Sequence, residues 1–116
     1  MRNTHSSVRV LVLAALVACS AMGGARAADE APLAVTIRDH RFVPPQIEIP
    51  SGQKRQLQID NQDASAEEFE SHSLHREKII PANSRASVFI GPLKPGRYEF
   101  FGEFNESTAR GVIIAR

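Results

Sequence analysis

The chain has 116 residues, with 14 Lys and Arg against 13 Asp and Glu, and a single cysteine. Three of the arginines precede Ala28, so the rest of the chain carries 11 basic and 13 acidic side chains, a net charge of −2 with neutral histidines. A net-acidic domain lacks the basic face that binds phosphates, which argues against a nucleic-acid partner. One cysteine also excludes an intramolecular disulfide.

Residues 1–27 have the features of an export signal. Arginines give a positive start, and residues 10–18 form an apolar run too short to span a bilayer. A small-x-small site ending at Ala27 predicts cleavage there, which leaves one compact domain over residues 28–116. The alternative is a lipoprotein signal ending before Cys19, because Leu-Val-Ala-Cys fits the site at which bacterial lipoproteins are cut and lipidated. Both alternatives predict a periplasmic domain, and the second adds a lipid anchor at Cys19.

Short stretches of alternating apolar and polar residues follow one another along the mature chain. Strands are expected around residues 33–37, 47–49, 57–59, 69, 79–80, 88–90, 98–104 and 111–115. Pro44 and Pro45 interrupt the alternation, because proline cannot donate to a sheet ladder. Only residues 64–70 leave a helix open as an alternative to a strand. Regular spacing with Gly and Pro between strands predicts an all-β, Greek-key β-sandwich of about seven or eight strands.

The first candidate site is the acidic stretch that ends at His72. If residues 68–72 are extended, Phe69 points to the core while Glu68, Glu70 and His72 share the opposite face. Two carboxylates and an imidazole on one face can chelate a hard or borderline cation. The alternative is a solvated strand face, whose charges keep an exposed edge from pairing with other chains.

The second candidate segment is Glu103-Phe104-Asn105-Glu106. Phe104 is expected to be buried, which leaves Glu103 and Asn105 on one side and Glu106 at the turn. These oxygen ligands extend the first set if the two loops meet, and otherwise they form an ordinary polar hairpin. No nucleophile elbow, phosphate loop or dinucleotide fingerprint is present, so the sequence predicts no catalytic residues.

Residues 93–111 have the outline of a blue-copper loop without its ligands. A Lys-Pro-Gly turn, an aromatic strand and a loop closing on Gly-Val-Ile-Ile are typical of the end of a cupredoxin. In that pattern a Cys follows the aromatic strand, a His comes three residues later, and a Met follows. Here Gly102 and Asn105 occupy the first two places and no Met follows. A Cys-based blue-copper centre therefore cannot form in the mature domain.

Three segments in order carry a more specific likeness: Glu68-Phe-Glu-Ser71, Leu74-x-x-Glu-Lys78, and residues 91–104. Together they resemble bacterial periplasmic cupredoxin-like proteins of the iron-permease-associated branch, the EfeO type. The likeness covers residues 33–116. It implies a cupredoxin-like sandwich that binds copper and/or iron, and that binds or oxidises ferrous iron for an inner-membrane iron permease and other periplasmic uptake components.

Carried over by position, the resemblance implies a site of Glu68, Glu70, Glu103 and Glu106. Relatives of this branch often have His where this chain has Asn105, a difference that weakens copper binding more than iron binding. The predicted ligands are thus Glu68, Glu70 and Glu103, completed by His72, Asn105 or Glu106, with Phe69, Phe101 and Phe104 as walls. The sequence does not decide whether the protein also oxidises iron with turnover as an accessory ferroxidase. The alternative function is a metal-free interaction module that docks on a permease or another envelope partner.

Overall fold

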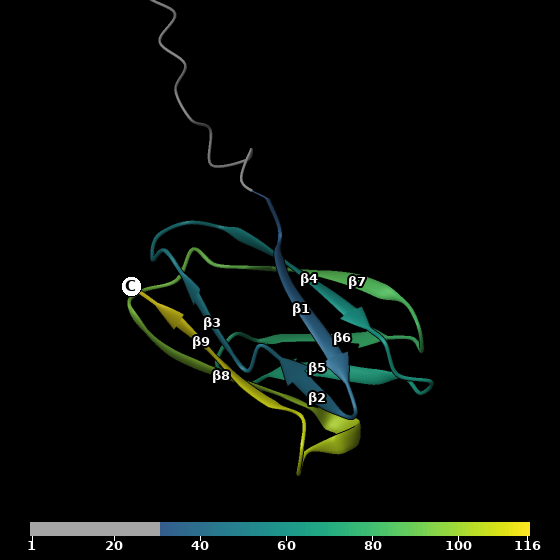
Figure 1. Ribbon diagram of the computed structural model, residues 1–116. Coiled ribbons are helices and arrows are strands. Elements are labelled where there is room, and N and C mark those ends of the chain that lie inside the picture. Colours follow the sequence, from purple (N-terminus) through teal and green to yellow (C-terminus); the bar gives the residue numbers. More distant parts are fainter. Residues whose placement is uncertain (1–30) are drawn as a thin grey trace, which may run out of the picture.

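The computed structural model describes residues 31–116, which fold into two packed β-sheets (Figure 1). In spatial order the first sheet contains β2 (Arg41–Val43), β1 (Leu33–Arg38), β4 (Arg55–Asn61) and β7 (Arg85–Ile90). The second contains β3 (Gln46–Ile49), β9 (Arg110–Ala115), β8 (Gly96–Gly102), β5 (Glu67–Ser71) and β6 (Arg76–Ile80). A 3-10 turn, η2 (Glu103–Asn105), follows β8. Within this range no helix has the length and apolarity needed to cross a membrane.

The prediction of an all-β sandwich is confirmed, with nine strands in place of seven or eight. The additional strand is β2, which pairs antiparallel with β1 before the two prolines interrupt the chain. Residues 64–70, for which a helix was the alternative, contain the start of β5. The expected strand over 98–104 ends at Gly102, because η2 turns the chain there. The predicted export signal and Cys19 lie outside the described residues.

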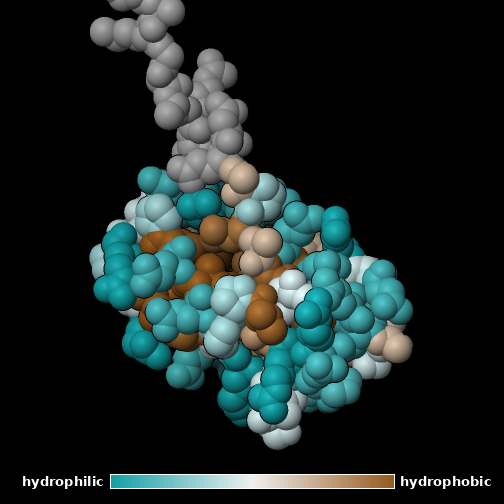
Figure 2. All heavy atoms as spheres, viewed as in Figure 1, coloured by the Kyte–Doolittle hydropathy of each residue, from teal (hydrophilic) through white to brown (hydrophobic). Residues whose placement is uncertain are grey.

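Inward-facing side chains of both sheets form one hydrophobic core. The aromatic rings of Phe42 and Phe100 meet edge to face at 4.9 Å between centroids, and Phe69 lies 5.0 Å from Phe100. Gly111 leaves room for Phe100, since a Cβ at this position would lie 2.2 Å from the ring Cζ. Figure 2 shows apolar atoms between the two sheets and hydrophilic residues around them. The core therefore holds β5 and β8 in a fixed relation.

The pairing of β5 with β8 brings the two predicted site segments together. Phe69 lies opposite Gly102 and Glu70 lies opposite Phe101, in an antiparallel ladder. Continuing this register places Glu68 beside Glu103, the first residue of η2. Residues separated by more than thirty positions in sequence thus become neighbours on one face.

Candidate metal site

β5 alternates between the core and the outer face of its sheet. Glu67, Phe69 and Ser71 are buried, whereas Glu68 and Glu70 are half-buried on the opposite side. This confirms the predicted orientation of Phe69, Glu68 and Glu70, which follows from the two-residue period of a strand.

Glu103 joins this outer face from η2. One carboxylate oxygen from each of Glu68, Glu70 and Glu103 lies within 4.8 Å of the others. We call these three residues the carboxylate trio. Metal–oxygen bonds to hard cations measure about 2.0–2.6 Å, so two oxygens on opposite sides of one ion lie about 4–5 Å apart. The trio therefore has the spacing needed to bind one cation without a large rearrangement.

The surroundings of Glu68 and Glu70 raise the pKa of both carboxyl groups. Partial burial raises the pKa of Glu68, and the negative charge of Glu103 raises it further. Hydrogen bonding with Glu103 raises the pKa of Glu70, with desolvation adding to the effect, while nearby His72 acts in the opposite direction. A group of acids in this state is stabilised by a proton or by a cation between the oxygens.

Of the three predicted completing ligands, His72 contacts a member of the trio. Its side chain is 80% exposed, its Nδ1 atom lies 3.6 Å from Glu70 Oε1, and its ring lies 5.3 Å from that of Phe101. Glu106 lies just past η2 and lines a neighbouring surface cavity of about 650 Å³ that also borders His72. Asn105 turns inward and donates its Nδ2 hydrogen to Glu67 Oε2 at 2.7 Å.

The predicted aromatic walls are only partly present. Phe69 lies in the core, and Phe101 lies half-buried beside His72. The expectation that Phe104 is buried is wrong, because its side chain is 52% exposed. Once η2 interrupts the strand, the two-residue alternation used to place Phe104 inside no longer applies.

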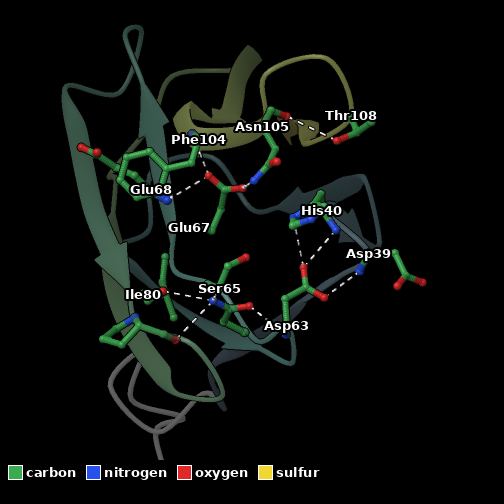
Figure 3. A network of polar contacts seen from close by, with 12 residues as sticks. Asp39, His40, Asp63, Ser65, Glu67, Glu68, Ile80, Phe104, Asn105 and Thr108 are labelled. Carbon is green, nitrogen blue, oxygen red and sulfur yellow. Dashed lines mark hydrogen bonds and ion pairs between the residues drawn. The ribbon is translucent and has the colours of Figure 1, made fainter.

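The sequence analysis missed Glu67, a carboxylate that is only 1% exposed. Its Oε1 atom accepts hydrogen bonds from the backbone N–H groups of Phe104 (2.9 Å) and Glu68 (3.0 Å). Its Oε2 atom accepts the bond from Asn105, and Figure 3 shows the carboxylate among these donors. The two-residue period of a strand could have identified Glu67, because it lies two positions before Phe69 and shares the inward face of β5.

Glu67 also lies against the two residues that replace ligands of the blue-copper sequence pattern. Gly102 and Asn105 stand at the Cys and His positions of that pattern, and both contact the Glu67 side chain. A Cβ atom at residue 102 would lie 2.6 Å from Glu67 Cδ and 2.6 Å from Ala109 Cβ. Cys19, the chain's single cysteine, and both methionines precede residue 31. The described domain thus offers oxygen and imidazole ligands, which suit iron, manganese, calcium or Cu(II) better than Cu(I).

Known proteins share this fold. The solved structures similar to it include amicyanin from Paracoccus versutus, which is 16% identical, with a TM-score of 0.59 over 78% of this chain and 88% of that one. The metal-binding domain of the Streptococcus pneumoniae D39 Cu(I)-exporting ATPase CopA, solved with Cu(I), has a TM-score of 0.66 at 14% identity, over 73% and 84% of the two chains. At these identities the likeness concerns the fold alone.

A relative with higher sequence identity is the uncharacterized protein RP394 of Rickettsia prowazekii (strain Madrid E), which is 51% identical over 80 residues. The match covers 69% of this chain, and the chain spans 64% of the length of that relative. Residues 9–115 match the family described as the cupredoxin-like domain. This chain therefore belongs to the cupredoxin-like domain family.

Proposed function

We propose that this protein is a periplasmic metal-binding protein that assists iron uptake. It binds copper and/or iron at the carboxylate trio and binds or oxidises ferrous iron for an inner-membrane iron permease. The observation that carries the proposal is the convergence of Glu68, Glu70 and Glu103, whose oxygens lie within 4.8 Å of one another. Desolvation and then the charge of Glu103 raise the pKa of Glu68, and a resident cation would balance that charge.

The ligand chemistry favours iron over a soft metal. Three carboxylates are hard donors, and His72 is close enough to add an imidazole by a change of rotamer. An anionic, oxygen-rich site binds Fe(III) more strongly than Fe(II), because the trivalent ion gains more Coulomb energy. Preferential binding of the product ion favours oxidation of ferrous iron. The electrons would pass to dioxygen or to another acceptor in the uptake system.

Calorimetric titration of the mature domain tests the binding. We expect Cu(II) and Fe(II), the latter under anaerobic conditions, to bind with a Kd in the micromolar range or below, and Glu70→Ala with Glu103→Ala to abolish the heat. Glu48→Ala is the matched control, because Glu48 is an exposed glutamate on β3 whose ion pair with Arg116 lies on the surface. A folded wild-type protein that binds neither metal would refute the proposal. Oxygen consumption with ferrous iron then separates binding from ferroxidase turnover.

A second candidate function is a metal-free interaction module that docks on a permease or another envelope partner. The observation that favours it is exposed apolar surface around the acidic face. Ile79 on β6 is 54% exposed and lies opposite Glu68, and Phe104 adjoins Glu103. A metal bound to the native state raises Tm by mass action, whereas the docking function predicts an unchanged Tm with either metal and a partner recovered by crosslinking.

A further inference from the structure

We infer that Glu67 is a positioning residue whose buried carboxylate holds the Glu103-bearing turn against β5 and so assembles the carboxylate trio. The functional meaning of this inference rests on the proposed metal site, while its structural content can be tested without a metal. No ligand role is assigned to Glu67, because its oxygens are occupied by donors from the protein.

The turn after β8 is closed by its own backbone bonds. The Gly102 N–H donates to Ala109 O at 2.8 Å, and the Ala109 N–H donates to Asn105 O at 2.8 Å. These bonds give the turn its shape but connect it to nothing on β5. The ladder between β5 and β8 pairs Phe69 with Gly102 and extends no further into the turn.

Glu67 supplies polar links between β5 and the turn beyond that ladder. Its carboxylate accepts one hydrogen bond from the backbone N–H of Phe104 and another from the side-chain amide of Asn105, the next residue in the turn. Both bonds are charge-assisted and shielded from water, because the Glu67 side chain is buried. Glu103 directly precedes the anchored Phe104 nitrogen, so the same contacts hold the backbone from which its carboxylate reaches Glu68 and Glu70.

The surroundings of Glu67 are shaped to hold its carboxylate. Gly102 has no Cβ atom, and this leaves room for Glu67 Cδ. The neighbouring Glu68 N–H donates to Oε1 as well, so three donors share the two oxygens. A buried carboxylate without such donors would be strongly destabilised. Charge and hydrogen bonding together therefore favour one orientation of Glu67, with its oxygens turned toward η2.

Two substitutions that remove the same charge separate anchoring from electrostatics. Glu67→Gln keeps an acceptor for the Phe104 and Glu68 N–H groups, and the Asn105 amide can rotate so that its oxygen accepts from the new NH₂ group. Glu67→Leu fills a similar volume but offers no acceptor. Asn105→Ala is a milder second variant that removes one anchoring bond, in case the leucine variant fails to fold.

The experiment measures Mn(II) affinity by calorimetry and hydrogen exchange of the Phe104 amide by NMR, with Leu57 in the core as the reference amide. We expect Glu67→Leu to weaken Mn(II) binding about 10- to 100-fold, which is the usual effect of losing a residue that orients metal ligands. The Mn(II) affinity of Glu67→Gln should stay within about threefold of wild type. Phe104 exchange should accelerate in the leucine and alanine variants while Leu57 stays protected.

Equal Mn(II) affinity and equal Phe104 protection in Glu67→Leu and Glu67→Gln would overturn the inference, since the backbone bonds of the turn would then suffice. If Asn105→Ala leaves Phe104 exchange unchanged, the side-chain anchor is refuted as well. If wild type binds no Mn(II), the proposed metal function fails on its own, and Phe104 exchange still decides whether Glu67 positions the turn.

Discussion

Replacing Gly102 with cysteine places a thiol at the position that a copper cupredoxin uses, yet we expect it to create no blue-copper centre. The Cβ atom of the new residue would lie 2.6 Å from Glu67 Cδ and 2.6 Å from Ala109 Cβ, far inside van der Waals contact. Both neighbours are held in place, Glu67 by its hydrogen bonds and Ala109 by the backbone bond from Gly102. The substitution therefore overpacks a closed site.

The expected loss of stability follows from two opposing effects. Overpacking of a filled site costs about 1–3 kcal/mol. Gly102 has φ −91° and ψ 111°, a conformation that any residue adopts. Replacing this glycine lowers the conformational entropy of the unfolded chain, which stabilises the folded state by about 0.4–1 kcal/mol. The net loss is about 1–2 kcal/mol. With a urea m-value near 1 kcal/mol/M, the unfolding midpoint should fall by about 1–2 M.

Urea unfolding followed by circular dichroism measures this loss, and absorption spectra after addition of Cu(II) test for the thiolate–copper band. Gly102→Ala separates the Cβ clash from thiol chemistry and should account for most of the loss. Combining Gly102→Cys with Ala109→Gly removes the close contact with Ala109 Cβ and should recover part of the loss in the unfolding midpoint. A Gly102→Cys variant as stable as wild type that turns blue with copper would refute the reasoning.

Three further predictions follow from the trio and the core. Glu70→Gln should raise the Tm of the metal-free protein at neutral pH while weakening metal binding, because it removes one of three mutually repelling charges. Folding raises the pKa of Glu68 and Glu70 above 4.5, so their contribution to stability is present below that pH and lost as pH rises through the raised values. The Tm advantage of Glu70→Gln should therefore shrink on acidification, and bound metal should be released over the same range in a pH-jump titration. Gly111→Ala should cost about 2–3 kcal/mol in urea unfolding, because its Cβ would overlap the Phe100 ring at 2.2 Å, and an unchanged midpoint would contradict the packing described for the core.

Local alternation predicted most strands and one half of the candidate site. Leu57 and Ile59 alternate with polar residues and are both fully buried, and Phe69 separates two outward glutamates as its position in a strand requires. The prediction failed at Phe104, where a 3-10 turn replaces the strand period. Glu67 was overlooked because glutamate side chains are usually exposed. Its position two residues before Phe69 nevertheless placed it on the inward face of the strand.

The sequence by itself determined the all-β class, the absence of Cys and Met from residues 31–116, and the shared face of Glu68 and Glu70. These properties depend on composition and on the two-residue period of an extended chain. Only the tertiary structure decided that Glu103 joins them, because the register between β5 and β8 depends on packing between distant segments. It also decided that Asn105 turns inward to a buried Glu67, since the space left by Gly102 exists only once the sandwich has closed.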